Sequence, residues 1–122
     1  MESSKMKGQV VVLNFWFTGC QPCIEEIPDL NKLVDYYTGK KVTFISFTYN
    51  KSIVVKKFLT QHPFKFKIVA DNDTVRRENF KLFSAWPYTI IISKKGKIVD
   101  MHLCSRVSET FAYFKEQINS LL

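Results

Sequence analysis

Hydrophobic residues follow two patterns along the chain, short continuous runs and runs with helical spacing. The clearest continuous run is 9–17, where β-branched and aromatic residues predominate, as in a strand buried on both faces. In the next segment apolar residues return at helical intervals, which predicts a helix with one apolar face. These positions are Ile24, Ile27, Leu30, Val34 and Tyr37. Pro22 suits the first turn of this helix, and Pro28 is expected to kink it.

The same two patterns recur to the end of the chain. Further strands are predicted at 42–47, 66–70, 88–93 and 98–103. Further helices are predicted from Ser52 to before Pro63, from the capping residues 71–74 to about Phe80, and from Ser108 onward. The order β-α-β-α-β-α-β-β-α predicts an α/β fold with a central mixed sheet, helices on both faces and a terminal antiparallel hairpin. We expect residues 1–8 to be a flexible N-terminus and residues 9–122 to form one domain.

Composition supports a single packed domain. The 122 residues are 46% hydrophobic and 24% charged, with few glycines and prolines, which excludes a disordered or fibrous class. No apolar run approaches the roughly 18 residues that a membrane span needs. Residues 1–8 contain no apolar core typical of a signal peptide, so the compartment does not follow from this segment.

The net charge of +7 raises the question of an anionic partner. The basic pairs fall in separate segments, at 40–41, 56–57, 76–77 and 94–97. A nucleic-acid-binding protein is expected to cluster its charge, so we interpret each pair as a solvated helix face or turn and expect no nucleic-acid partner. Acidic partners and an anionic membrane surface remain open.

The candidate chemistry lies in Cys20-Gln21-Pro22-Cys23, between the first predicted strand and the first helix. Free N–H groups and the helix dipole at a helix start stabilise a thiolate, and the two-residue gap brings the second sulfur within reach of the first. We assign Cys20 as the nucleophile and Cys23 as the thiol that resolves a mixed disulfide. Cys104, in the last strand pattern, is predicted to be a core residue.

Pro87 is the second candidate residue, since it follows Trp86 and opens a predicted strand. A cis bond there would turn the backbone of Trp86 toward the cysteines as a docking edge for substrate. The alternative is an ordinary proline at the entry of a strand, and the CxxC motif favours the cis interpretation.

The stretch 14–28, NFWFTGCQPCIEEIP, resembles the signature of the TlpA/ResA-like branch of the thioredoxin superfamily. The resemblance continues through 51–61, which is similar to the helix that this branch inserts after the second strand, and through 70–73 and 86–92. It implies a thioredoxin fold with the TlpA-type βα insertion. It also implies a bacterial, extracytoplasmic or membrane-tethered protein that reduces disulfides, with no cofactor beyond its dithiol. The implied partners are proteins that contain disulfides and a thiol electron donor.

Carried over by position, the resemblance makes Cys20 and Cys23 the redox pair, Pro87 the cis proline and Glu26 an acid that tunes the thiols. The alternative for Glu26 is that it and Glu25 are simply favourable acids in the first turn of a helix. The resemblance implies that Trp86, Gly19, Gln21 and Pro22 contact the substrate.

The chain departs from the superfamily pattern at three places. Asn14 stands where thioredoxins proper have a buried aspartate, which fits the TlpA-like branch. Gly19 replaces the usual tryptophan before the first cysteine and is expected to open the rim of the site. Residues 1–8 are too short for the N-terminal β-hairpin with which family members normally start.

Three other functions remain as alternatives. A copper-binding module of similar fold would pair the CxxC with a distant histidine, for which His102 is the candidate, although no metal spacing is present. A redox-inert interaction domain would keep its cysteines idle. A thiol peroxidase would need a Pro-Thr-x-x-Cys setting, which the chain lacks. We expect a monomeric oxidoreductase that holds no metal.

Overall fold

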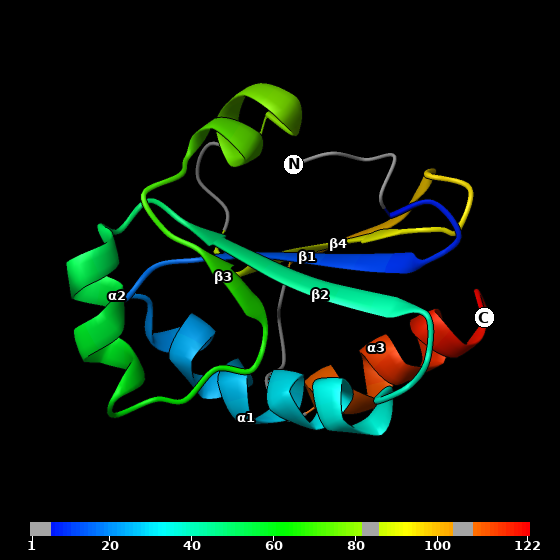
Figure 1. The fold of residues 1–122 in the computed structure, drawn as a ribbon, viewed down its shortest axis with the longest axis horizontal. Helices are drawn as coiled ribbons and strands as arrows, with labels where there is room; N and C mark the ends of the chain where they lie inside the picture. Colours follow the sequence, from blue (N-terminus) through cyan, green and yellow to red (C-terminus); the bar gives the residue numbers. More distant parts are fainter. Residues whose placement is uncertain (1–5, 82–85, 104–108) are drawn as a thin grey trace.

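The computed structural model describes residues 6–81, 86–103 and 109–122. Five strands form one sheet in the order β3-β2-β1-β4-β5 (Figure 1). The strands are β1 (Val10–Trp16), β2 (Val42–Thr48), β3 (Lys67–Val69), β4 (Tyr88–Ile92) and β5 (Ile98–Leu103). The helices are α1 (Gln21–Tyr36), α2 (Ser52–Leu59), the short η2 (Val75–Asn79) and α3 (Thr110–Asn119). The α/β class and the mixed sheet are therefore confirmed.

Strand β1 lies at the centre of the sheet and is buried along its whole length. It pairs in parallel with β2 and antiparallel with β4, so its backbone hydrogen bonds are satisfied on both sides. This position explains why residues 9–17 form a nearly continuous apolar run rather than an alternating one. Strand β5 supplies the antiparallel edge that the terminal hairpin predicts.

The two faces of the sheet are covered unequally. Helices α1, α2 and α3 lie on the same side in Figure 1, and side chains from all three share one core cluster with Val10, Val12 and Trp16. The opposite face buries Val11, Leu13 and Phe15, and Val75 of η2 packs against this second cluster. Helices cover both faces as expected, but on one face the described helix is only the five-residue η2.

Element boundaries differ only slightly from those expected. Helix α1 continues through Pro28, and α2 ends at Leu59, before Pro63. The segment that follows β3 is a π-helix rather than an ordinary α-helix. No helix in the described ranges is long and apolar enough to cross a membrane. The predicted cap Ser108 and the core assignment of Cys104 lie outside the described residues.

Candidate functional site

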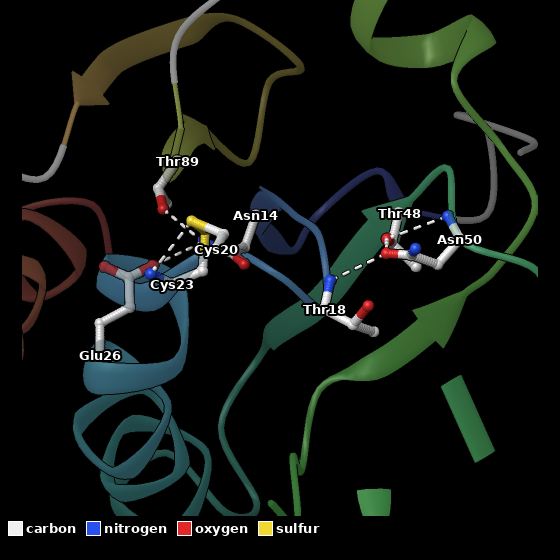
Figure 2. Close-up of a disulfide and its surroundings, with 8 residues drawn as sticks. All are labelled: Asn14, Thr18, Cys20, Cys23, Glu26, Thr48, Asn50 and Thr89. Atoms are coloured by element: carbon white, nitrogen blue, oxygen red, sulfur yellow. Dashed lines mark hydrogen bonds between the residues drawn. A yellow bond between two sulfur atoms is a disulfide. The ribbon is translucent and has the colours of Figure 1, made fainter. Parts of the chain in front are cut away.

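The two cysteines lie where β1 leads into α1. Cys20 is the N-cap of α1, and Pro22 occupies the first turn, where a missing N–H breaks no helical bond. The sulfurs of Cys20 and Cys23 form a disulfide across a Cα–Cα distance of 5.2 Å (Figure 2). The structure thus places the predicted redox pair at the predicted strand-to-helix junction.

The start of α1 provides the electrostatic environment that a reactive thiol needs. The backbone N–H of Cys23 donates to Sγ of Cys20 at 3.3 Å, so one free amide of the helix start already points at this sulfur. Together with the helix dipole, this amide favours the thiolate form of Cys20 in the reduced protein. Cys20 is 5% exposed and Cys23 2% exposed. Both cysteines are therefore buried.

A buried polar network lies next to the disulfide (Figure 2). Asn14 on β1 donates through Nδ2 to Oε1 of Glu26 on α1 at 3.0 Å and to Oγ1 of Thr89 on β4 at 3.0 Å. All three side chains are at most 2% exposed. Glu26 comes three residues after Cys23 on the helix, and side chains at this spacing are neighbours. A carboxyl group in this position can exchange a proton with the dithiol.

The network bears on the interpretation of Glu26 as a solvated acid of the first helical turn, and its role toward the thiols stays a prediction. Glu25 is exposed and fits the description of a solvated acid near a helix start, whereas Glu26 is buried and bonded across elements. Thr89 was not found from the sequence. The available signal was a single hydroxyl residue inside the otherwise apolar run that follows Tyr88, at the position that pairs with Asn14.

Pro87 lies close to the end of β1 that leads to the cysteines. The Trp86–Pro87 peptide bond is cis, the isomer expected from the sequence. The next residue, Tyr88, pairs with Phe15 of β1, so Pro87 is level with the last residue of that strand. Trp86 packs against the core cluster that contains both cysteines. The backbone at Trp86 is therefore part of the same end of the sheet as the redox pair.

Two aromatic rings and one arginine surround Trp86. The ring of Trp86 lies 4.9 Å from that of Phe17 and 5.9 Å from that of Tyr49, measured between centroids. The guanidinium carbon of Arg76 lies 4.5 Å from the centroid of the Trp86 ring, which is a cation–π arrangement. Arg76 is buried, and Asp73 accepts hydrogen bonds from its Nε at 2.7 Å and its Nη2 at 3.0 Å.

The hydrogen bonds from Arg76 are the main reason why the pKa of Asp73 lies below its usual range. Asp73 is therefore an anion at neutral pH and holds the guanidinium group in place. The sequence predicts a solvated face at the pair 76–77. This is wrong for Arg76, which is buried against Trp86, while Arg77 is exposed as expected.

The loop before Cys20 is held by Asn50, which sequence reasoning missed. Its Oδ1 accepts from the backbone N–H of Thr18 at 2.8 Å and from Oγ1 of Thr48 at 3.0 Å. The backbone carbonyl of the same residue accepts from the N–H of Asp71 at 2.8 Å. Asn50 therefore ties the loop that carries Gly19 to the ends of β2 and β3, as Figure 2 shows for its side chain.

Gly19, Gln21 and Pro22 lie around Cys20. A Cβ added at Gly19 would meet only the ring of Phe17, at 3.5 Å, which is an ordinary contact. The rim therefore has space at this position, as expected for a glycine in place of a tryptophan. Gln21 and Pro22 are exposed in the first turn of α1.

His102, the candidate ligand for copper, is engaged elsewhere. Its ring stacks on Tyr113 with centroids 4.1 Å apart and meets Phe114 edge-on at 5.4 Å. Among residues 6–81, 86–103 and 109–122, no three histidine, cysteine or acidic side chains gather where they could hold a metal ion.

A comparison with protein families identifies the family of this chain. The AhpC/TSA family model matches residues 1–101. The chain belongs to the AhpC/TSA family. Within this family it is similar to the thiol–disulfide oxidoreductase ResA of Bacillus cereus, with 31% identity over 119 residues that cover 97% of this chain and 68% of the relative.

Solved structures show the same fold. A proposed thiol:disulfide interchange protein DsbE from Chlorobium tepidum matches with a TM-score of 0.85 and 24% identity, covering 100% of this chain and 86% of that one. StoA from Bacillus subtilis matches with a TM-score of 0.72 and 21% identity, over 88% of this chain and 84% of that one. The resemblance to the ResA-like branch and the thioredoxin-like fold are thereby confirmed. The assignment of α2 and β3 as the TlpA-type insertion stays a prediction.

Proposed function

We propose that this AhpC/TSA-family protein is a thiol–disulfide oxidoreductase that reduces disulfides of other proteins. The observation that carries the proposal is the Cys20–Cys23 pair at the start of α1, with an amide of the helix directed at Sγ of Cys20. Its relatives of ResA type are named as thiol–disulfide oxidoreductases, which supports the same chemistry here.

The reaction exchanges one disulfide for another. The thiolate of Cys20 attacks one sulfur of the substrate disulfide, which forms a mixed disulfide and releases the first substrate sulfur as a thiolate that takes up a proton. Cys23 loses its proton and attacks Sγ of Cys20, which releases the second substrate sulfur and leaves the Cys20–Cys23 disulfide. Two electrons pass from the protein dithiol to the substrate. A thiol donor then returns the pair to the reduced state, and no cofactor takes part.

The neighbouring residues have separate roles in this proposal. Glu26 takes up or supplies the proton of the dithiol, and its negative charge opposes formation of a second anion nearby. The backbone at Trp86 and Pro87 docks the substrate chain beside the disulfide. Gly19, Gln21 and Pro22 form the surface that the substrate crosses to reach Cys20.

The partners and compartment follow from the resemblance. We infer that the substrates are proteins outside the cytoplasm and that the protein acts as a monomer. Detection of the protein in separated cell fractions tests the compartment. A protein found only in the cytoplasmic fraction would contradict the inference.

Two cysteine variants test the mechanism. Cys20→Ser should abolish reduction of a protein disulfide such as that of insulin, because no nucleophile remains. Cys23→Ser should accumulate a mixed disulfide that a reductant releases, because the resolving thiol is missing. Cys104→Ser is the matched control and should retain full activity. A fully active Cys20→Ser protein would contradict the proposal.

A further inference from the structure

One end of the molecule carries a concentration of lysines that the sequence does not show. The start of β1, the turn into β2 and the β4–β5 turn meet at this end in Figure 1. The backbone N–H of Gly8 donates to the carbonyl of Lys94 at 3.0 Å, and that of Val10 donates to the carbonyl of Lys41 at 2.9 Å. We call these residues the lysine end: Lys7, Lys40, Lys41, Lys94, Lys95 and Lys97.

The segments that carry the lysine end contribute no acidic side chain of their own. The segments 6–9, 39–42 and 93–97 contain no aspartate or glutamate. The ion pairs found within the described ranges join Lys32 with Asp29, Lys65 with Asp35 and Arg76 with Asp73, and none involves the lysine end. The lysines at 40–41 and 94–97 lie in turns and are mostly exposed, as interpreted, and the parallel and antiparallel pairing of β1 brings these two turns to the same end of the sheet.

Three of these lysines share a surface hollow. The residues that line it are Lys40, Lys41 and Lys94 together with Tyr36, Tyr37, Gly39, Asn119 and Leu122. Tyr36 is 50% exposed, and its ring is also in contact with the ammonium of Lys115 at 4.9 Å from the centroid. The hollow thus combines several cations with an amphipathic aromatic ring.

We propose that the lysine end binds the surface of an anionic phospholipid membrane. Ammonium groups are point charges that attract headgroup phosphates without demanding one geometry, and tyrosine is favoured where a membrane meets water. A groove for single-stranded nucleic acid would instead combine basic side chains with several aromatic platforms along its length. The lysine end offers one half-exposed tyrosine and no arginine.

This orientation leaves the redox pair free for substrate. Helix α1 runs from Cys20 to the turn that carries Lys40, and its 16 residues span about 24 Å at 1.5 Å per residue. The Cys20–Cys23 disulfide is thus at the opposite end from the bound surface. The binding needs no thiol chemistry, so it stands or falls independently of the proposed oxidoreductase activity.

The test measures how much of the 122-residue protein sediments with vesicles. Vesicles of phosphatidylglycerol and phosphatidylcholine in equal parts should bind it, vesicles of phosphatidylcholine alone should not, and added salt should weaken the binding because it screens exposed charges. Each lysine near an anionic surface contributes roughly fivefold to binding. Lys40→Glu/Lys41→Glu should therefore reduce binding by more than about tenfold.

The matched control is Lys56→Glu/Lys57→Glu on α2, whose lysines are exposed and remote from the lysine end in Figure 1. Each double variant lowers the net charge from +7 to +3, because every lysine-to-glutamate change removes two charges. The control should keep most of the binding. Lys94→Glu/Lys95→Glu provides a second test if the first variant does not fold.

Three results would overturn the proposal. The protein could fail to bind the anionic vesicles at about 0.15 M salt, where surface charges act over roughly 8 Å. The control variant could lose as much binding as the two lysine-end variants, which would assign the effect to net charge alone. A single-stranded oligonucleotide could bind more tightly than the vesicles and depend on the same lysines, which would assign the surface to nucleic acid.

Discussion

Asn14 joins three elements of the fold through one side-chain amide. Its Nδ2 donates to Glu26 on α1 and to Thr89 on β4, while Asn14 itself belongs to the central strand. In a buried setting such bonds are costly to lose, because the groups left behind have no water to replace them. The carboxyl of Glu26 is therefore held at one place beside the dithiol by contacts that also hold the sheet to the helix.

We predict that Glu26→Gln changes how the thiols respond to pH. The glutamine keeps an oxygen that can accept from Asn14 but cannot carry a negative charge, so no charge at this position opposes formation of the Cys20 thiolate. The midpoint for alkylation of the reduced protein should therefore move to lower pH. The measurement is the rate of iodoacetamide labelling at a series of pH values.

The control for this prediction is Glu25→Gln, which removes an exposed carboxylate one residue earlier. Its alkylation profile should coincide with that of the unmodified protein. If Glu26→Gln also leaves the profile unchanged, or if both variants shift it equally, Glu26 has no special role toward the thiols.

Among the elements, η2 supports a residue of the proposed substrate-docking backbone. Asp73 lies just before this short helix and Arg76 lies within it. The guanidinium of Arg76 packs on the ring of Trp86. Trp86 in turn forms the cis bond with Pro87. A helix on one face of the sheet thus supports the backbone at which the substrate is proposed to dock.

We predict that Arg76→Ala impairs the use of protein substrates more than the chemistry itself. Loss of the cation–π contact should raise KM for a protein disulfide by about two- to tenfold, while the rate with a small aromatic disulfide stays within about twofold. Steady-state kinetics with the two substrates separate these effects. Arg77→Ala, at an exposed position, should change neither value, and an equal loss with both substrates would mean that Arg76 only stabilises the fold.

Helices α1 and α3 are joined by Tyr37. Its hydroxyl donates to Oδ1 of Asn119 at 2.7 Å and lies 3.1 Å from the carbonyl of Lys115. Burial, with a smaller contribution from Tyr36, raises the pKa of Tyr37 to about 12. A group whose pKa is higher in the folded protein contributes stability that is present below its unfolded pKa of about 10 and is lost as the pH rises through its folded pKa.

We therefore predict that Tyr37→Phe weakens the loss of stability between about pH 10 and about pH 12. The measurement is the free energy of unfolding in urea at pH values across this window. Burial and the bonded Asp100 also raise the pKa of Tyr113 to about 12, so some loss should persist in the variant. A Tyr37→Phe protein with the same slope as the unmodified one would contradict this assignment.

The strands and α-helices could be predicted within a few residues because their patterns are local. The apolar run of β1 follows from burial of the strand on both faces. The helical spacing of α1 follows from burial of the helix on one face. Arg76 and Thr89 could not be found in this way. Their importance depends on partners distant in sequence, and arginine is exposed far more often than buried.

At the scale of the whole molecule, the fold separates two ends with different chemistry. The redox pair and its aromatic surroundings lie at the start of α1, and the lysine end lies near the close of the same helix. The CxxC motif could be predicted from the sequence because its chemistry lies within four residues. The lysine end could not, because only the order β3-β2-β1-β4-β5 brings its segments together.

In the proposed reaction, Cys20 and Cys23 exchange two electrons as one unit. The most direct measurement equilibrates the protein in graded redox buffers and counts alkylated thiols by mass. We predict one transition in which both thiols appear together, at a potential nearer to about −270 mV than to about −120 mV, as for reductases. The alkylation of Cys104 should not change with the potential of the buffer. Independent labelling of Cys20 and Cys23, with no paired transition at any potential, would contradict the account.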